Sequence, residues 1–269
     1  MLGAIIGDTV GSVYEFNNIK TTDFPLFSKK SNYTDDSIMS IAVADWLLTD
    51  PQHSLDTLEK SLVNFAGKYP CPMGGYGGMF KRWLFGDVER QPYNSWGNGS
   101  AMRASAVGWM FDSIEETEQV AKISAEITHN HPEGIKGAQA TAAAIFMARN
   151  GKSKTEIKDF ISKTYGYNLD RNCDEIRKVY DWDSSCQGTV PEAIIAFLDS
   201  TDFESAIRLA VSLGGDSDTL ACITGGIAEA FYKEIPDDIA TSMWEKLPDD
   251  FKVILKELEQ KTNYTLPRH

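Results

Sequence analysis

Two short acidic clusters carry the residue types in this chain that are best suited to chemistry. Thr34-Asp35-Asp36 and Asp216-Ser217-Asp218-Thr219 each come directly before a long apolar run with helical periodicity. Carboxylates at the start of a buried helix repel one another and lose hydration, which costs several kcal/mol per ion unless a cation or another partner is present. The pattern therefore favours one metal site, with ligands from both ends of the chain.

Helix capping is the alternative explanation, because Asp, Ser and Thr are preferred at N-caps and in first turns. Two Pro-Asp-Asp segments, residues 236–238 and 248–250, serve as internal controls. They open amphipathic runs in which capping explains the acids fully. The runs that follow Asp36 and Asp218 contain almost no charge, so they should lie inside the molecule. On these residues alone, capping and metal binding both remain open.

The ligand types narrow the choice of ion. Carboxylates and Thr hydroxyls are hard oxygen donors, and neither cluster contains Cys or His, so Mg²⁺, Mn²⁺ or Ca²⁺ fits better than Zn²⁺. Four carboxylates could hold two ions, an arrangement that orients neighbouring oxygens and activates a water.

Two further segments could bind a ligand. Residues 97–103 form a glycine-bearing loop that leads into a helix, where free N–H groups can hold a phosphate. This loop lacks both the Gly-Lys-Ser/Thr of a P-loop and the GxGxxG spacing, so a plain turn with a cap is the alternative. His129 and His131 lie before Pro132 without a third zinc ligand nearby. The favoured role for these two histidines is therefore helix capping or hydrogen bonding, and contact with a ligand is the second alternative.

Composition limits the classes of protein. The chain has 269 residues, of which 42% are hydrophobic, enough for one domain spanning residues 1–269. The net charge of −13 argues against a nucleic acid or an anionic membrane as partner. No apolar stretch is long enough to span a bilayer, and the N-terminus does not read as a signal peptide. Four cysteines without metal spacing indicate a reduced, cytoplasmic location: Cys71, Cys173, Cys186 and Cys222.

Helical patterns follow one another along the chain, so the predicted fold class is all-α. Gly3, Gly7 and Gly11 have four-residue spacing, which predicts a smooth helix face that another backbone can approach. Residues 69–78 are predicted to be a loop. Further helices are predicted at residues 55–69, 132–149, 154–164, 191–199 and 203–213.

Taken together, the motifs resemble the ADP-ribosylglycohydrolase family over about residues 1–232. Five segments occur in that family's order: Gly3-Ala4-Ile5-Ile6-Gly7-Asp8, Tyr33-Thr34-Asp35-Asp36-Ser37, Gly97-Asn98-Gly99-Ser100-Ala101-Met102-Arg103, Thr128-His129-Asn130-His131-Pro132 and Leu213-Gly214-Gly215-Asp216-Ser217-Asp218-Thr219. The ordered set is far more specific than any single motif.

The resemblance implies an all-α, single-domain orthogonal helical bundle with a binuclear Mg²⁺ (or Mn²⁺) centre. By position, the implied metal ligands are Thr34, Asp35, Asp36, Asp216, Asp218 and Thr219. The implied substrate-binding residues are Gly99, Ser100, Ala101, Met102 and Arg103 in the loop for the pyrophosphate and adjacent ribose, with His129 beside the ADP-ribose. Asp36 and Asp218 are the candidates for residues that both bind the metal and transfer protons. Glu15 matches a glutamate that gates access to the metals in the serine-directed branch.

The predicted reaction is hydrolysis at C1″ of ADP-ribose attached to an arginine or serine side chain, through an oxocarbenium-like state. The glycine-rich segment 74–83 is predicted to be a loop on the substrate side. The partner would be an ADP-ribosylated protein or a small ADP-ribose conjugate, and the enzyme a monomer. The alternatives are a noncatalytic ADP-ribose-binding or structural relative, and a metal hydrolase that cleaves the pyrophosphate instead.

Overall fold

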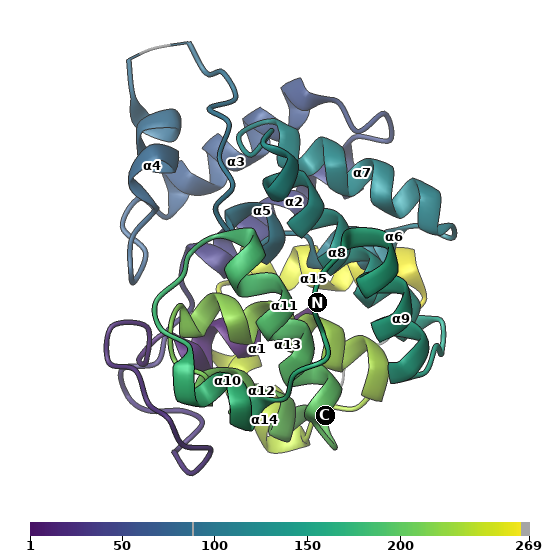
Figure 1. Cartoon of the computed structure of the whole chain (residues 1–269). Helices are drawn as coiled ribbons and strands as arrows, with labels where there is room; N and C mark the ends of the chain where they lie inside the picture. The colour runs from purple at the N-terminus through teal and green to yellow at the C-terminus, as the bar shows by residue number, and fades with distance from the viewer. Residues whose placement is uncertain (88, 265–269) are drawn as a thin grey trace.

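The computed structural model describes residues 1–87 and 89–264 of the chain. Within these residues it contains fifteen α-helices and no strand (Figure 1), so the all-α prediction is confirmed. The helices are α1 (Leu2–Gly11), α2 (Asp35–Thr49), α3 (Leu55–Lys68), α4 (Gly78–Phe85), α5 (Gly99–Met102), α6 (Ser105–Met110), α7 (Ile114–Glu126), α8 (Pro132–Arg149), α9 (Lys154–Tyr165), α10 (Cys173–Val179), α11 (Cys186–Asp199), α12 (Phe203–Ser212), α13 (Ser217–Tyr232), α14 (Asp237–Lys246) and α15 (Asp249–Thr262).

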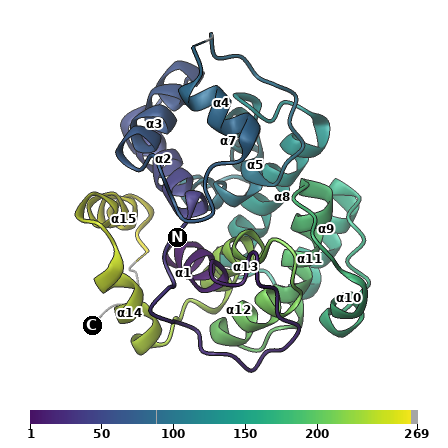
Figure 2. The same cartoon turned by 90° about the vertical axis from the view of Figure 1, so that its left-hand side faces the viewer.

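Helices α1 and α13 pack side by side in the middle of the molecule (Figure 2). All ten residues of α1 are buried. A Cβ atom added at Gly7 would lie 1.9 Å from the carbonyl oxygen of Ala221, and one at Gly3 would lie 2.4 Å from that of Gly225. The two backbones can approach this closely only because the contacting face of α1 has no side chains there. The predicted smooth glycine face is confirmed.

The two apolar runs behind the acidic clusters are buried helices, as predicted. Helix α2 packs against α3, α6 and α15, and α13 packs against α11, α12 and α8 as well as α1. Thr34 is the N-cap of α2, and its hydroxyl accepts a 3.2 Å hydrogen bond from the Asp36 amide. The first turns of both helices lie against α1, since Thr34 and Ser37 bond to Asp8 and the backbone of Asp218 packs on Gly11.

Helix α8 organises the other half of the structure, where it packs against α5, α6, α7 and α9. It begins at Pro132, and Nδ1 of His131 accepts a 3.1 Å hydrogen bond from the Glu133 amide. Capping, predicted for this histidine, is confirmed. None of the helices in the described residues is long and apolar enough to cross a membrane.

Two predicted boundaries were wrong. The helix placed at residues 191–199 starts at Cys186, because Ser185 caps it, and Pro191 lies inside this helix. The loop placed at residues 74–83 becomes helix α4 at Gly78, since Phe80, Trp83 and Leu84 follow helical spacing and are buried. Only the residues before α4 keep the loop character that the glycines indicated.

Candidate functional site

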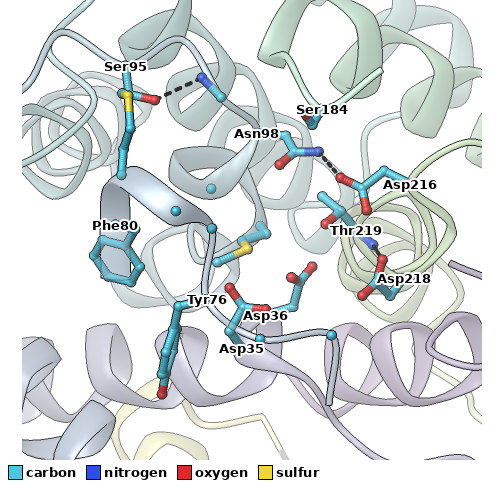
Figure 3. A pocket seen from close by; sticks show the side chains of 18 of the residues that line it. Asp35, Asp36, Tyr76, Phe80, Ser95, Asn98, Ser184, Asp216, Asp218 and Thr219 are labelled. Atoms are coloured by element: carbon cyan, nitrogen blue, oxygen red, sulfur yellow. Dashed lines mark hydrogen bonds between the residues drawn. The ribbon is translucent and has the colours of Figure 1, made fainter. Parts of the chain in front are cut away.

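A pocket of about 440 Å³ lies where the N-termini of α2 and α13 meet, and Figure 3 shows it from close by. Asp35 and Asp36 face Asp216 and Asp218 across it. These side chains come from clusters that are far apart in the sequence, so the packing of α1, α2 and α13 brings them together. The rest of the pocket lining includes α5, His129 and the start of α4.

Glu15 completes the acidic end of the pocket. It lies just after α1, and ligand oxygens of Glu15, Asp216 and Asp218 all lie within 4.8 Å of one another. Asp35 and Asp36 line the same pocket, so five carboxylates share one cavity. Such a concentration of negative charge is unfavourable without a compensating group.

The pKa values of these carboxyl groups are raised by burial and by their mutual proximity. Burial, followed by the neighbouring carboxylates, raises the pKa of Asp35, Asp36 and Asp218 well above its usual range. The pKa of Glu15 is raised to about 7 by burial, then by Asp216 and Asp8. Each charged form lacks solvent and meets like charges, which is the environment that a bound cation reverses.

Unpartnered oxygens indicate where a cation fits. Within the described residues, Oδ1 of Asp36 and Oε2 of Glu15 are buried and have no hydrogen-bond partner. A buried carboxylate oxygen without a donor normally needs one, or a metal. All donors at this end of the pocket are oxygens, the ligand type that Mg²⁺ and Mn²⁺ prefer. The residues present therefore fit a divalent metal site.

The two threonines of the predicted ligand set differ in position. Thr219 lines the pocket, and its backbone amide donates a 3.0 Å hydrogen bond to Oδ1 of Asp218. Thr34 is fully buried, and its hydroxyl donates a 2.7 Å hydrogen bond to Oδ1 of Asp8. Its side-chain oxygen is thus already used as an N-cap and as a donor.

Asp8 is a positioning residue that sequence reasoning missed. It lies inside α1, fully buried, and accepts hydrogen bonds from the amides of Thr34 (2.9 Å) and Ser37 (3.0 Å) and from both of their hydroxyls. It thereby fixes the first turn of α2, which carries Asp35 and Asp36. The available signal was an aspartate within an otherwise uncharged, glycine-faced helix.

Asn18 joins the segment of Glu15 to the turn of Asp216. Its side-chain amide donates to the carbonyl oxygens of Tyr14, Glu15 and Gly215, and its oxygen accepts from the Gly215 amide at 2.7 Å. Gly214 and Gly215 both have positive φ, so this turn uses backbone conformations that glycine adopts readily. One side chain therefore sets the relative position of two acidic segments.

We expect Asn18→Ala to lower the free energy of unfolding by about 1–3 kcal/mol, because several buried or half-buried backbone groups lose their partner. Asn17→Ala is the matched control, since Asn17 is exposed one position away, and its effect should stay within about 0.5 kcal/mol. Chemical denaturation measures both. Equal effects of the two substitutions would show that Asn18 is not the link described.

The predicted phosphate loop lies at the other end of the pocket, but only part of it faces the cavity. Gly99, Met102 and Arg103 line the pocket. Ser100 and Ala101 are fully buried and do not line it. Ser100 donates a 2.7 Å hydrogen bond to the Gly134 carbonyl oxygen, which ties the loop to α8.

Arg103, the last residue of this loop segment, and His129 are both buried. Nη2 of Arg103 donates to the carbonyl oxygen of Ser124 (2.8 Å) and the hydroxyl of Thr128 (2.9 Å), and burial lowers the pKa of Arg103 to about 10. It remains a cation at neutral pH. Burial and the Arg103 charge hold the pKa of His129 well below its usual range, so its imidazole is neutral. Its Nε2 lies against Gly99, where an added Cβ would be 3.1 Å away.

Asn98 links the two ends of the pocket. Its amide Nδ2 donates to Oδ2 of Asp216 at 2.7 Å (Figure 3) and to the hydroxyl of Thr189 at 3.1 Å. The predicted phosphate loop and the second acidic cluster are thus held in a fixed relative position.

A sequence model of the family described as ADP-ribosylglycohydrolase matches residues 1–265.

The chain belongs to the ADP-ribosylglycohydrolase family. The ADP-ribosylhydrolase ARH3 of Bos taurus is 26% identical over 318 residues, which cover 88% of this chain and 85% of that protein. The ADP-ribosylarginine hydrolase Tri1 of Pseudomonas putida (strain GB-1) is 23% identical, over 86% of this chain and 69% of its own. A solved structure titled ADP-ribosylglycohydrolase-related protein complex superposes with a TM-score of 0.73 and 21% identity, over 97% of both chains, and shows the shared fold.

Family membership confirms the resemblance seen in the motifs and extends it from about residue 232 to residue 265. It also confirms the prediction that the chain is a glycohydrolase. The ADP-ribosylglycohydrolase family is metal-dependent in general, and the acidic cluster of this member could hold an ion.

Proposed function

We propose that this ADP-ribosylglycohydrolase cleaves the bond between C1″ of ADP-ribose and a protein side chain, arginine or serine, and releases ADP-ribose in a metal-dependent reaction. The observation that carries the proposal is the pocket itself, which is lined by five carboxylates and also by Arg103, His129 and Gly99. The relatives support it, since one is named a hydrolase of ADP-ribosylarginine and others are named ADP-ribosylhydrolases.

The metal centre we propose holds two Mg²⁺ ions, with Mn²⁺ as an alternative. Its ligands would be drawn from Thr34, Asp35, Asp36, Asp216, Asp218 and Thr219. When bound, two such ions supply positive charge that orients the ribose hydroxyls and activates a water. The unpartnered Oδ1 of Asp36 is the strongest local support for this assignment.

The side chains of the pocket would divide the remaining work. Asp36 and Asp218 are buried carboxylates suited to holding and moving a proton at the carboxyl oxygen, and Glu15 stands beside Asp218 at the pocket wall. Arg103 supplies a buried positive charge toward the pyrophosphate. Neutral His129 can hydrogen-bond the nucleotide without adding charge. We assign Ser100 and Ala101 to shaping the loop, because neither faces the cavity.

Partners and setting are also proposals. The substrate would be an ADP-ribosylated protein, with a small ADP-ribose conjugate as the alternative, and the enzyme would act as a monomer in the cytoplasm. All four cysteines are free thiols, which suits a reducing compartment.

We expect removal of divalent metal to abolish hydrolysis and lower Tm. Wild-type protein is treated with chelator, and release of ADP-ribose from arginine- and serine-modified peptides is measured before and after Mg²⁺ or Mn²⁺ is restored. Restored metal should raise Tm in a concentration-dependent manner, because a ligand that binds only the folded state stabilises it. Full activity of the chelated protein, with Tm insensitive to metal, would contradict the proposed centre.

A further inference from the structure

Two exposed aromatic side chains stack at the mouth of the pocket. Phe16 and Trp182 have ring centroids 5.7 Å apart and ring planes inclined by 17°. They are 69% and 46% exposed, and both line the pocket. Large aromatic side chains that are exposed to solvent beside a pocket are typical of a surface that binds a ligand or a partner. Neither residue has a role in the site described above.

The pair lies at the acidic end of the pocket. Phe16 directly follows Glu15, whose carboxylate is grouped with that of Asp216. Trp182 follows Asp181, whose carbonyl oxygen packs 3.1 Å from an added Cβ at Gly215, next to Asp216. Both aromatic residues are thus anchored beside the same carboxylate.

Hydrogen bonds fix the two segments that carry the pair. Nζ of Lys20 donates a 2.7 Å hydrogen bond to the carbonyl oxygen of Tyr180, which joins the segment of Phe16 to that of Trp182. Asn18 ties the first segment to Gly215. The aromatic surface is therefore held in place by its backbone, although the rings themselves are exposed. A preformed surface binds without the cost of ordering it.

Charge indicates the kind of group that this surface receives. Five carboxylates line the pocket, and two divalent ions would offset four of those charges, which leaves the acidic end anionic. Asp181 and Asp183 flank Trp182. Lys20, the cation tied to this region, directs its amino group to the carbonyl oxygens of Tyr180 and Leu213. An aromatic face beside several carboxylates favours a planar cation.

We propose that Phe16 and Trp182 form the acceptor subsite, and that the acceptor is the guanidinium of an ADP-ribosylated arginine. The inference rests on the proposed function, because that function places the bond to be cut at the acidic end. A guanidinium stacks on an aromatic face and remains charged. A serine acceptor offers neither the charge nor the planar surface.

The test compares two peptides of one sequence, ADP-ribosylated on arginine or on serine. With metal-loaded enzyme, we expect Phe16→Ala and Trp182→Ala to raise KM for the arginine peptide about 3- to 30-fold. Hydrolysis of the serine peptide, and the affinity for free ADP-ribose measured by calorimetry, should stay within about twofold of wild type, which corresponds to less than about 0.5 kcal/mol. Trp182→Phe should keep most of the arginine affinity. Val179→Ala, at an 81% exposed residue outside the pocket lining, is the control.

Three results would overturn the acceptor subsite. Equal losses on both peptides would show that the pair does not distinguish acceptors. A parallel loss of ADP-ribose affinity would assign the rings to the nucleotide. Wild-type cleavage of the serine peptide alone would exclude a guanidinium acceptor and leave the proposed function intact. Failure of the wild type to release ADP-ribose from either peptide would instead contradict the proposed function itself, and the subsite would fall with it.

Discussion

Substitution of Asp36 or Asp218 by alanine is expected to lower kcat/KM for an ADP-ribosylated peptide by about 10³-fold or more. Both carboxylates are buried and line the pocket, and their pKa values are raised first by burial and then by neighbouring carboxylates. In the proposed mechanism, loss of either one would remove a metal ligand and a proton-handling group at once. Steady-state kinetics with saturating Mg²⁺ measure the effect.

The same variants should not be unstable without metal. Each substitution removes one of several mutually repelling carboxylates, so the Tm of the chelated variant should equal or exceed that of the chelated wild type. Metal should then stabilise the variants less than the wild type. Asp249→Ala is the matched control, because Asp249 also lies in a helix first turn but is exposed. Retained activity in Asp36→Ala, with wild-type metal stabilisation, would refute the assignment.

Gly7→Ala is expected to destabilise the protein by about 3 kcal/mol or more, because overpacking of a rigid contact cannot relax. The added Cβ would lie 1.9 Å from the Ala221 carbonyl oxygen, a backbone atom of α13. Helix α1 would have to move away from α13. Urea denaturation measures the change in free energy of unfolding.

Gly67→Ala is the control for this substitution, since Gly67 is also in a helix, is exposed, and has no atom within 4 Å of an added Cβ. Alanine there should stabilise by about 0.4–1 kcal/mol. The two glycines thus predict changes of opposite sign. Gly7→Ala should also weaken metal stabilisation, because α1 carries Asp8 and α13 carries Asp218. A change at Gly7 as small as that at Gly67 would contradict the packing described for α1 and α13.

Local signals in the sequence predicted most of the fold. Acidic caps before uncharged runs located α2 and α13, and the spacing of three glycines predicted the face of α1. The boundaries that failed have local causes of their own. Ser185 was not recognised as a cap, and Pro191 was taken as a helix start although it lies inside α11.

The support around the site could not be read locally. Asn18 bonds to a backbone 197 positions away, and Asp8 holds amides 26 and 29 positions away. No pattern of spacing predicts such contacts, because they depend on how α1 packs. The stacking of Phe16 on Trp182 has the same origin. The sequence thus indicated which residues could do chemistry. The residues that hold those side chains in position, such as Asn18 and Asp8, are determined by tertiary packing.

The most direct test of the account is to identify the nucleotide released when the metal-loaded wild-type protein acts on an ADP-ribosylated peptide. Mass spectrometry of the products resolves the alternatives in one reaction. We expect ADP-ribose together with the unmodified peptide, because the carboxylates are proposed to act at C1″. Release of AMP, with phosphoribose left on the peptide, would show that the pyrophosphate is cut and would contradict the central claim.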